Sequence, residues 1–241
     1  MRLRQLNGQR LWGHIMGLSV RLERRGISFR EKVISSSKQR PKSLILIGDG
    51  TPDDYIVALL AFKFNGRRPV WLTKPKRTGT AIFGTLHTYL RMGRELNEIL
   101  VLIDQDANSE SEVFERAREV LEGTRIVISE DKRSSRLGVL SCGYGGRTLK
   151  LIVLMNGLDI PKLKKHTVED HLLKAMGLRL GEGKVEKLLR EAEYDPKSAW
   201  GKLSRKERNE IIEGLFEMKK ERLKDIFPQH FEAFGLLHRT S

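Results

Sequence analysis

The segment Ile99-Leu100-Val101-Leu102-Ile103-Asp104-Gln105-Asp106 decides how this chain is expected to fold. Five consecutive apolar residues predict a strand buried on both faces, as in a parallel sheet, and acidic residues follow it directly. An earlier apolar run, Leu44-Ile45-Leu46-Ile47, is likewise followed by acids, in Gly48-Asp49-Gly50-Thr51-Pro52-Asp53-Asp54. Because the carboxyl ends of parallel strands border a common crevice, we expect the two acidic clusters to meet there.

Strand and helix patterns alternate from Ser43 onward. Strands are predicted at 44–48, 69–72, 99–103, 125–128 and 149–155, and helices at 53–64, 80–96 and 109–122. This alternation predicts an α/β fold, with a mostly parallel central sheet flanked by helices. The glycine-rich segment 142–146 is expected to form a hairpin or a flexible loop.

Three parts are predicted along the chain: a basic N-terminal arm and linker (1–42), the α/β domain (43–177) and a helical C-terminal extension (178–241). The extension shows helical periodicity, and one of its helices is expected to begin at Ser204, where Ser204 and Glu207 form a capping box. The apolar residues expected to be buried there are Val185, Leu188, Leu189, Ala192, Ile211, Ile212, Leu215 and Phe216.

The chain is strongly basic, with a formal net charge of +14 and a pI near 10.0. Residues 1–42 contain 11 Lys and Arg against two Glu, so the arm carries most of this charge. A strongly basic chain predicts a polyanionic partner, and nucleic acid fits better than a membrane surface. Arg24 and Arg25 of the arm are candidate contacts to nucleic acid, although an arginine-rich start is also typical of a transit peptide.

Cysteine is rare, with Cys142 as the one example among 241 residues. The chain therefore forms no internal disulfide and no cysteine-based zinc site, which favours a reducing, cytoplasmic location. No apolar stretch approaches 18 residues, so we expect no membrane-spanning helix.

Carboxylates that converge at one place repel each other unless a cation or a proton neutralises them. The two clusters therefore predict a site for Mg²⁺, or for Mn²⁺, with Asp49, Asp104 and Asp106 as metal ligands and catalytic groups and Asp53 as a further ligand. The alternative is structural: Asp49 and Asp53 would be turn and N-cap residues, and Asp104 and Asp106 would cap the next helix.

The order of these motifs resembles the TOPRIM family. Residues 44–57 resemble its first motif, an acid and a glycine after a strand, and residues 99–106 resemble its second, an Asp-x-Asp pair after a later strand. The resemblance covers about residues 43–155 and implies a Rossmann-like TOPRIM fold that holds magnesium for reactions on nucleic acid. One departure is Asp49, because the first acid of the family is usually glutamate.

A third acidic cluster lies in His166-Thr167-Val168-Glu169-Asp170-His171. It resembles an element that follows the sheet in the OLD-type nuclease branch of TOPRIM proteins and in small archaeal relatives. The resemblance implies that Glu169 and Asp170 approach the metal. Thr167 and Asp170 also match a capping box, which accounts for these residues without chemistry, and both interpretations stay open.

A basic loop, Lys74-Pro75-Lys76-Arg77, follows the second predicted strand. It leaves the sheet on the side where the acids emerge, so Lys74, Lys76 and Arg77 are candidate phosphate contacts. The alternative is a solvated basic turn without a ligand.

The leading hypothesis is a magnesium-dependent TOPRIM nuclease that cleaves phosphodiester bonds in DNA or RNA. A TOPRIM topoisomerase needs a further domain with a tyrosine nucleophile, and TOPRIM primases carry zinc ribbons that one cysteine cannot supply. The alternative is a non-catalytic nucleic-acid-binding protein on a degenerate TOPRIM scaffold. A phosphohydrolase with Asp104 as nucleophile ranks last, because Asp-Gln-Asp-Ala-Asn departs from the motif it requires. The sequence is compatible with a homodimer and with a helicase or ATPase partner.

Overall fold

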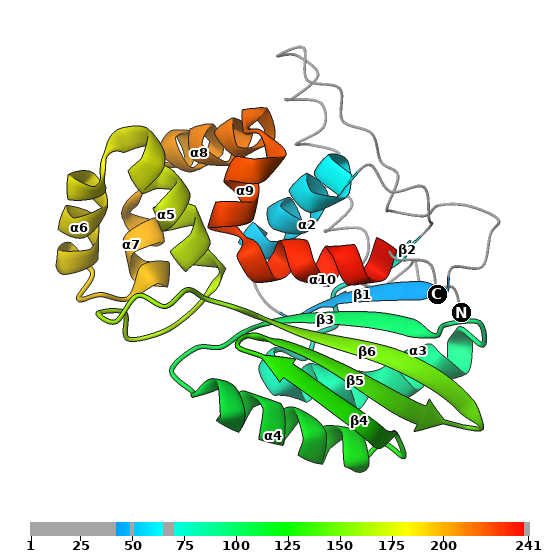
Figure 1. Cartoon of the computed structure of the whole chain (residues 1–241). Coiled ribbons are helices and arrows are strands. Elements are labelled where there is room, and N and C mark those ends of the chain that lie inside the picture. The colour runs from blue at the N-terminus through cyan, green and yellow to red at the C-terminus, as the bar shows by residue number, and fades with distance from the viewer. Residues whose placement is uncertain (1–41, 49–50, 65–69, 239–241) are drawn as a thin grey trace.

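A computed structural model describes residues 42–48, 51–64 and 70–238. Within these residues, six strands form one mixed sheet in the order β2-β1-β3-β6-β5-β4 (Figure 1). The strands are β1 (Ser43–Ile47), β2 (Val70–Thr73), β3 (Glu98–Asp104), β4 (Val127–Ser134), β5 (Leu137–Tyr144) and β6 (Arg147–Asn156). The α/β class predicted from the alternating patterns is confirmed.

Helices cover both faces of this sheet. The first part of the chain contains α2 (Thr51–Phe64), the 3-10 helix η2 (Gly79–Thr85), α3 (Leu86–Met92) and α4 (Glu110–Glu122). The last part contains α5 (Val168–Leu180), α6 (Glu182–Glu191), α7 (Pro196–Lys202), α8 (Arg205–Glu217), α9 (Lys220–Ile226) and α10 (Pro228–His238). The single helix expected at 80–96 is therefore wrong: η2 and α3 take its place, and α3 ends at Met92.

The parallel part of the sheet consists of β2, β1, β3 and β6, which pair in parallel in that order. β5 pairs antiparallel with both β4 and β6, so the sheet is mixed, with the mostly parallel core that the sequence predicted. Residues 142–146 form the hairpin that was one of the two expected forms: Cys142 and Gly143 belong to the end of β5, and the turn to β6 lies at Gly145 and Gly146. The predicted strands at 99–103 and 149–155 correspond to β3 and β6.

Alternate side chains of the central strands enter two separate cores. Ile45, Leu100 and Leu154 belong to the core under α2, α5 and α10, whereas Leu46 and Val101 belong to the core under α3 and α4. This alternation follows from the period of two along a strand. It also sets the side on which the residue at the end of each strand points.

The C-terminal helices share the first of these cores with the sheet. α5 runs without interruption across residue 177, and Phe227 and Phe234 of the last segments are almost fully buried against the same cluster. Of the residues expected to be buried in this part, Val185 and Leu188 are partly buried and the others are buried. Ser204 caps α8 together with Glu207 as predicted. The arm, apart from Lys42, lies outside the described residues.

None of the helices in the described part of the chain is long and apolar enough to span a membrane.

Candidate active site

Asp104 is the last residue of β3 and lies next to Asn156, the last residue of β6. Counting in steps of two from Leu100 and Leu154 places both side chains on the face covered by α2, α5 and α10. The Asn156 side chain donates through Nδ2 to Asp104 Oδ1 at 2.9 Å. The register of β3 and β6, together with the alternation of side chains along each strand, thus brings a carboxylate and an amide together at the carboxyl edge of the sheet.

Asn156 links this edge to two other elements. Its Nδ2 also donates to Asp53 Oδ1 of α2 at 2.7 Å, and its Oδ1 accepts from His230 Nε2 of α10 at 2.8 Å. Asp53, Asn156 and His230 are fully buried. The Asn156 amide therefore holds the Asp53 and Asp104 carboxylates near each other. Its orientation is fixed, because Nδ2 faces the two carboxylates and Oδ1 faces His230. The sequence predicted Asp53 at the site but gave no sign of Asn156 or His230.

Asp106 lies two residues beyond Asp104 in a left-handed backbone conformation, with φ of 57°. Asp tolerates this region better than most residues. Two backbone hydrogen bonds, from Asp106 N to His166 O at 2.9 Å and from His166 N to Asp106 O at 2.8 Å, join it to the segment before α5. This pairing brings the start of α5 to the end of β3.

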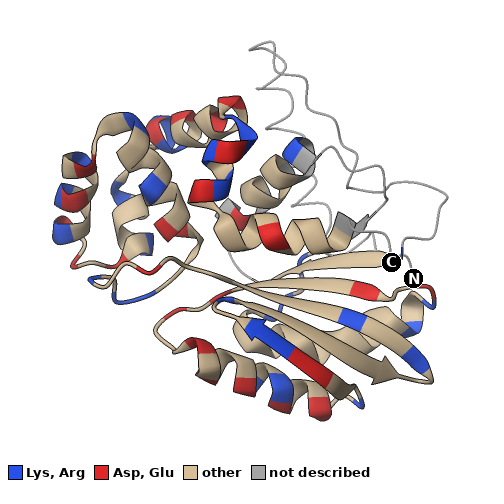
Figure 2. Cartoon of the chain, in the orientation of Figure 1, with Lys and Arg blue, Asp and Glu red and all other residues tan. Residues whose placement is uncertain are grey.

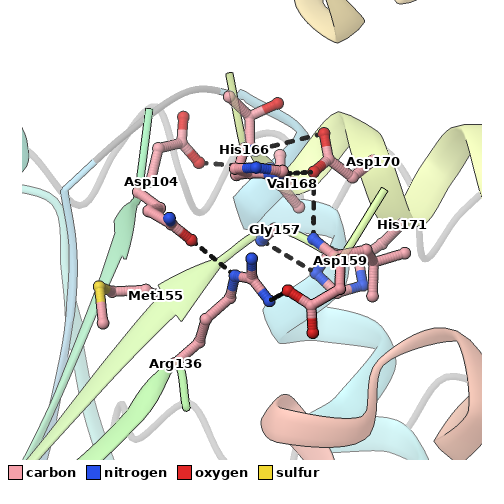
Figure 3. A network of polar contacts seen from close by, with 12 residues as sticks. Asp104, Arg136, Met155, Gly157, Asp159, His166, Val168, Asp170 and His171 are labelled. Carbon is pink, nitrogen blue, oxygen red and sulfur yellow. Dashed lines mark hydrogen bonds and ion pairs between the residues drawn. The ribbon is translucent and has the colours of Figure 1, made fainter. Parts of the chain in front are cut away.

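The N-terminus of α5 points toward Asp104, as Figure 3 shows. Val168 N donates to Asp104 Oδ1 at 3.3 Å, which adds the favourable end of the helix dipole to the carboxylate. Glu169 is 7% exposed, and its Oε2 has no hydrogen-bond partner among the described residues. Glu169 thus contributes a buried carboxylate to the same region.

Asp170 has a different role. Its Oδ1 accepts from Thr167 N at 3.3 Å, and its Oδ2 accepts from Leu158 N at 3.1 Å and lies 3.3 Å from His166 Nδ1 (Figure 3). Both oxygens are therefore engaged by the loop that precedes α5. Of the two interpretations of Asp170, the geometry favours capping.

Lys197, from the first turn of α7, completes the cluster. Its Nζ lies 2.7 Å from Asp104 Oδ2 and 3.7 Å from Asp106 Oδ1. Asp195 caps this helix by accepting from Ser198 N, and Pro196 occupies its first turn, so the local sequence fixes where α7 begins. Sequence reasoning missed Lys197, because nothing near residue 197 indicates which carboxylates it will meet.

Burial and charge act together on the ionisation of these groups. Burial raises the pKa of the Asp104 carboxyl, while the Lys197 ammonium acts in the opposite direction. Burial, with the nearby charge of Asp104, also raises the pKa of Glu169. Partial burial alone would lower the pKa of Lys197, but Asp104, Asp106 and Glu169 outweigh it and hold the pKa above its ordinary value. The site therefore keeps a cation among its acids.

The loop between β3 and α4 is held by a separate network of hydrogen bonds centred on Arg136. Arg136, in the turn between β4 and β5, donates through Nε to Gln105 Oε1 at 2.6 Å. Gln105 in turn donates through Nε2 to Asn108 O at 2.8 Å. Arg136 therefore fixes the residue between Asp104 and Asp106. The sequence gave no indication of this contact, which joins residues 31 positions apart.

The remaining predicted site residues lie elsewhere. Asp49, Arg24 and Arg25 lie outside the described residues. Lys74, Lys76 and Arg77 follow β2, at the carboxyl edge of the sheet but two strands from β3, or roughly 10 Å in the plane of the sheet.

The fit of the acidic residues to a metal depends on how many of them lie together. Within residues 42–48, 51–64 and 70–238, no group of three or more His, Cys, Asp or Glu side chains is placed to hold a metal ion. Asp104 and Asp106 nevertheless share one cation, the Lys197 ammonium. Mg²⁺ is commonly held by only one or two carboxylates, with water and substrate phosphate as its other ligands, so this oxygen pair fits it.

Comparisons of the chain with protein-family models, with curated proteins and with solved structures find no match.

Proposed function

We propose that the chain is a magnesium-dependent nuclease with a TOPRIM-type α/β domain, and that Asp104 and Asp106 are its central acidic residues. One observation carries the proposal: carboxylates that follow a central strand converge on a single cationic atom, Lys197 Nζ. The net charge of +14 supports a polyanionic substrate.

Asp104 and Asp106 would hold the metal, with Asp49 as the further ligand that the TOPRIM resemblance implies. Bound Mg²⁺ would polarise a phosphoryl oxygen and lower the pKa of an attacking water. Glu169 brings an unpartnered oxygen to the same region and is a further candidate ligand. Asp53 would act through Asn156, which orients it together with Asp104.

Lys197 has a distinct part in this proposal. Its side chain is 43% exposed, so its ammonium can move from the carboxylates to a phosphate that approaches from solvent. A cation beside the phosphoryl oxygens stabilises the charge that develops there during hydrolysis. The same residue would then balance the acids in the free protein and contact the substrate in the complex.

The test is cleavage of labelled single-stranded and double-stranded DNA and RNA in Mg²⁺ or Mn²⁺, with EDTA as the blank. We expect Asp104→Asn to reduce cleavage about 100-fold or more and to weaken Mn²⁺ binding measured by electron paramagnetic resonance. Glu119→Gln, which neutralises an exposed acid on α4, is the matched control and should leave both unchanged. Asp49→Glu tests the departure from the TOPRIM motif. Absence of cleavage on all four substrates, or full activity of Asp104→Asn, would refute the proposal.

A second candidate is a nucleic-acid-binding protein that has no catalytic activity. The observation that favours it is again Lys197, because an ammonium at 2.7 Å already neutralises Asp104 without any metal. Such a protein would bind nucleic acid equally well in EDTA, would cleave none of the substrates, and would be indifferent to Asp104→Asn.

A further inference from the structure

A groove of about 740 Å³ opens on the segment that follows β6. Its walls come from the turn between β4 and β5, the segment after β6, and helices α9 and α10. Gly157, one of the lining residues, directly follows Asn156, whose side chain binds Asp104. The groove and the acidic cluster are thus adjacent along the backbone of the same segment.

Arg136 gives the groove a fixed positive charge. Only 7% of its side chain is exposed, and its Nε is held by Gln105 Oε1 at 2.6 Å. Its Nη1 donates to Asp159 Oδ1 at 2.8 Å (Figure 3). The same Nη1 lies 3.6 Å from Glu110 Oε1. A buried guanidinium that is oriented in this way loses little entropy when it binds an anion, and its planar shape suits phosphate.

Asp159 is an exchangeable partner of this arginine. Its side chain is 85% exposed and lies on the segment after β6, so its carboxylate can turn into solvent. Glu110 Oε1, which lies 3.6 Å from Arg136 Nη1, then remains as a counter-charge for the buried guanidinium. The Asp159 carboxylate therefore marks the position at which the anionic group of a ligand would meet Arg136.

The other walls add charge and apolar surface. Lys220 and Lys224 line the groove from α9, where Figure 2 shows basic and acidic residues side by side, and Glu232 of α10 adds one acid. Leu236 of α10 and the edge of Phe231, a core residue that is 7% exposed, form the apolar side of the groove. Cations combined with an aromatic surface are typical of single-strand binding, where phosphates meet the charges and bases meet the rings. The volume is that of a small-molecule pocket and is too small for a duplex.

We propose that this groove binds one or two nucleotides of a single nucleic-acid strand, with a phosphate displacing Asp159 from Arg136. The choice of a nucleic-acid strand rests on the function proposed above. The strand would approach the acidic cluster past Leu158 and Asp159, on the segment that follows Asn156. The groove thus assigns the substrate class, a single strand, and the side from which it enters.

The test is fluorescence anisotropy of a labelled short oligodeoxythymidylate with the full chain in EDTA, so that cleavage plays no part. Asp159→Asn removes the competing carboxylate, and we expect binding to tighten about threefold. Lys224→Ala should weaken binding and lower the slope of log affinity against log salt by about 0.7. Lys187→Ala, an exposed lysine of α6 that does not line the groove, is the matched control and should change neither quantity.

Arg136→Gln should weaken binding about tenfold, and circular dichroism will show whether this variant remains folded. If it does not fold, Asp159→Asn and Lys224→Ala decide the question, because both residues are exposed. Unchanged affinity in both of these variants would overturn the proposal. Competition by a nucleoside 5′-monophosphate as effective as that by an unlabelled strand would overturn it too, since the ligand would then be a free nucleotide.

The two proposals fail in different ways. If Asp159→Asn and Lys224→Ala leave the affinity unchanged while metal-dependent cleavage is observed, only the proposal for the groove is refuted. If these variants change the affinity but no cleavage is observed, only the nuclease proposal is refuted, and the chain is a single-strand-binding protein.

Discussion

Acid should destabilise this fold through two imidazoles that are buried between the sheet and the C-terminal helices. His171 Nε2 accepts from Gly157 N at 3.3 Å, so its proton is on Nδ1, which donates to Ile226 O at 2.6 Å. His230 donates from Nε2 to Asn156 Oδ1 at 2.8 Å. Both rings are fully buried in their neutral forms, and protonation would place a charge where water cannot reach it.

The size of the effect follows from the pKa values. Burial lowers the pKa of His171 from 6.5 to about 3 and lowers that of His230 as well. The unfolded chain therefore takes up these protons first, and the stabilisation present above about pH 6.5 is lost as the pH falls toward 3. Each proton changes the free energy of unfolding by about 1.4 kcal/mol per pH unit. For His171, the loss from about pH 6.5 to about pH 4.5 is about 2 kcal/mol.

Two carboxyls act in the opposite direction. The pKa values of Asp104 and Glu169 are raised, so the folded chain takes up their protons before the unfolded chain does. Their contribution to stability grows as the pH falls toward their ordinary values. The wild-type slope is therefore a sum of opposing effects, and only a comparison between variants isolates the histidine.

The assay is urea unfolding, followed by tryptophan fluorescence, of wild type and His171→Gln between about pH 6.5 and about pH 4.5. We expect the slope of unfolding free energy against pH to be smaller in the variant by about 1.4 kcal/mol per unit. Phe227→Leu is the matched control, because Phe227 stacks on His171 with ring centroids 5.1 Å apart. It should lower stability equally at every pH. Parallel curves for wild type and His171→Gln would refute the reasoning.

Two further predictions concern the backbone near the site and the cysteine. Gly157 has a φ of 130°, and an added Cβ would lie 2.5 Å from His166 Cβ, so Gly157→Ala should cost about 2–3 kcal/mol in urea unfolding. Gly145→Ala, at φ of 56° with open space around it, should cost only about 1 kcal/mol, and equal losses would contradict the steric argument. Burial, together with the charge of Asp131, raises the pKa of the Cys142 thiol to about 11, so a thiol reagent at about pH 8 should label it only after unfolding. Rapid, stoichiometric labelling of the folded chain would contradict this.

The strands that the sequence predicted best are those buried on both faces. β3 and β1 are continuous apolar runs because helices cover both sides of them, and such runs are visible in any sequence. β5 was missed because its glycines suggested a loop. Gly138 lies in this strand because the Phe114 ring of α4 packs over it, and an added Cβ would be 2.4 Å from Phe114 Cε1. A glycine required by a distant side chain looks the same in sequence as one that forms a turn.

The residues of the candidate site also fall into those that the sequence predicted and those that it did not. Asp104 and Asp106 were predicted because their position depends on one strand and on the direction of its neighbours, which the local pattern specifies. Lys197 and Asn156 were not, because their contacts with Asp104 depend on how α7 packs and on the order of strands in the sheet. These contacts join positions 93 and 52 residues from Asp104, and no periodicity in the sequence extends that far.

The electrostatic environment of Asp104 depends on contacts from distant parts of the chain. Asp104 receives its hydrogen bonds from β6 and from the start of α5, and its counter-charge from α7. α5 and α7 belong to the core that the C-terminal helices share with the sheet, through residues such as Trp200. Loosening that core would move the ammonium and the helix terminus away from a carboxylate whose burial already raises its pKa. The C-terminal helices therefore set the charge state of the acidic cluster, although most of its acids lie on or near the sheet.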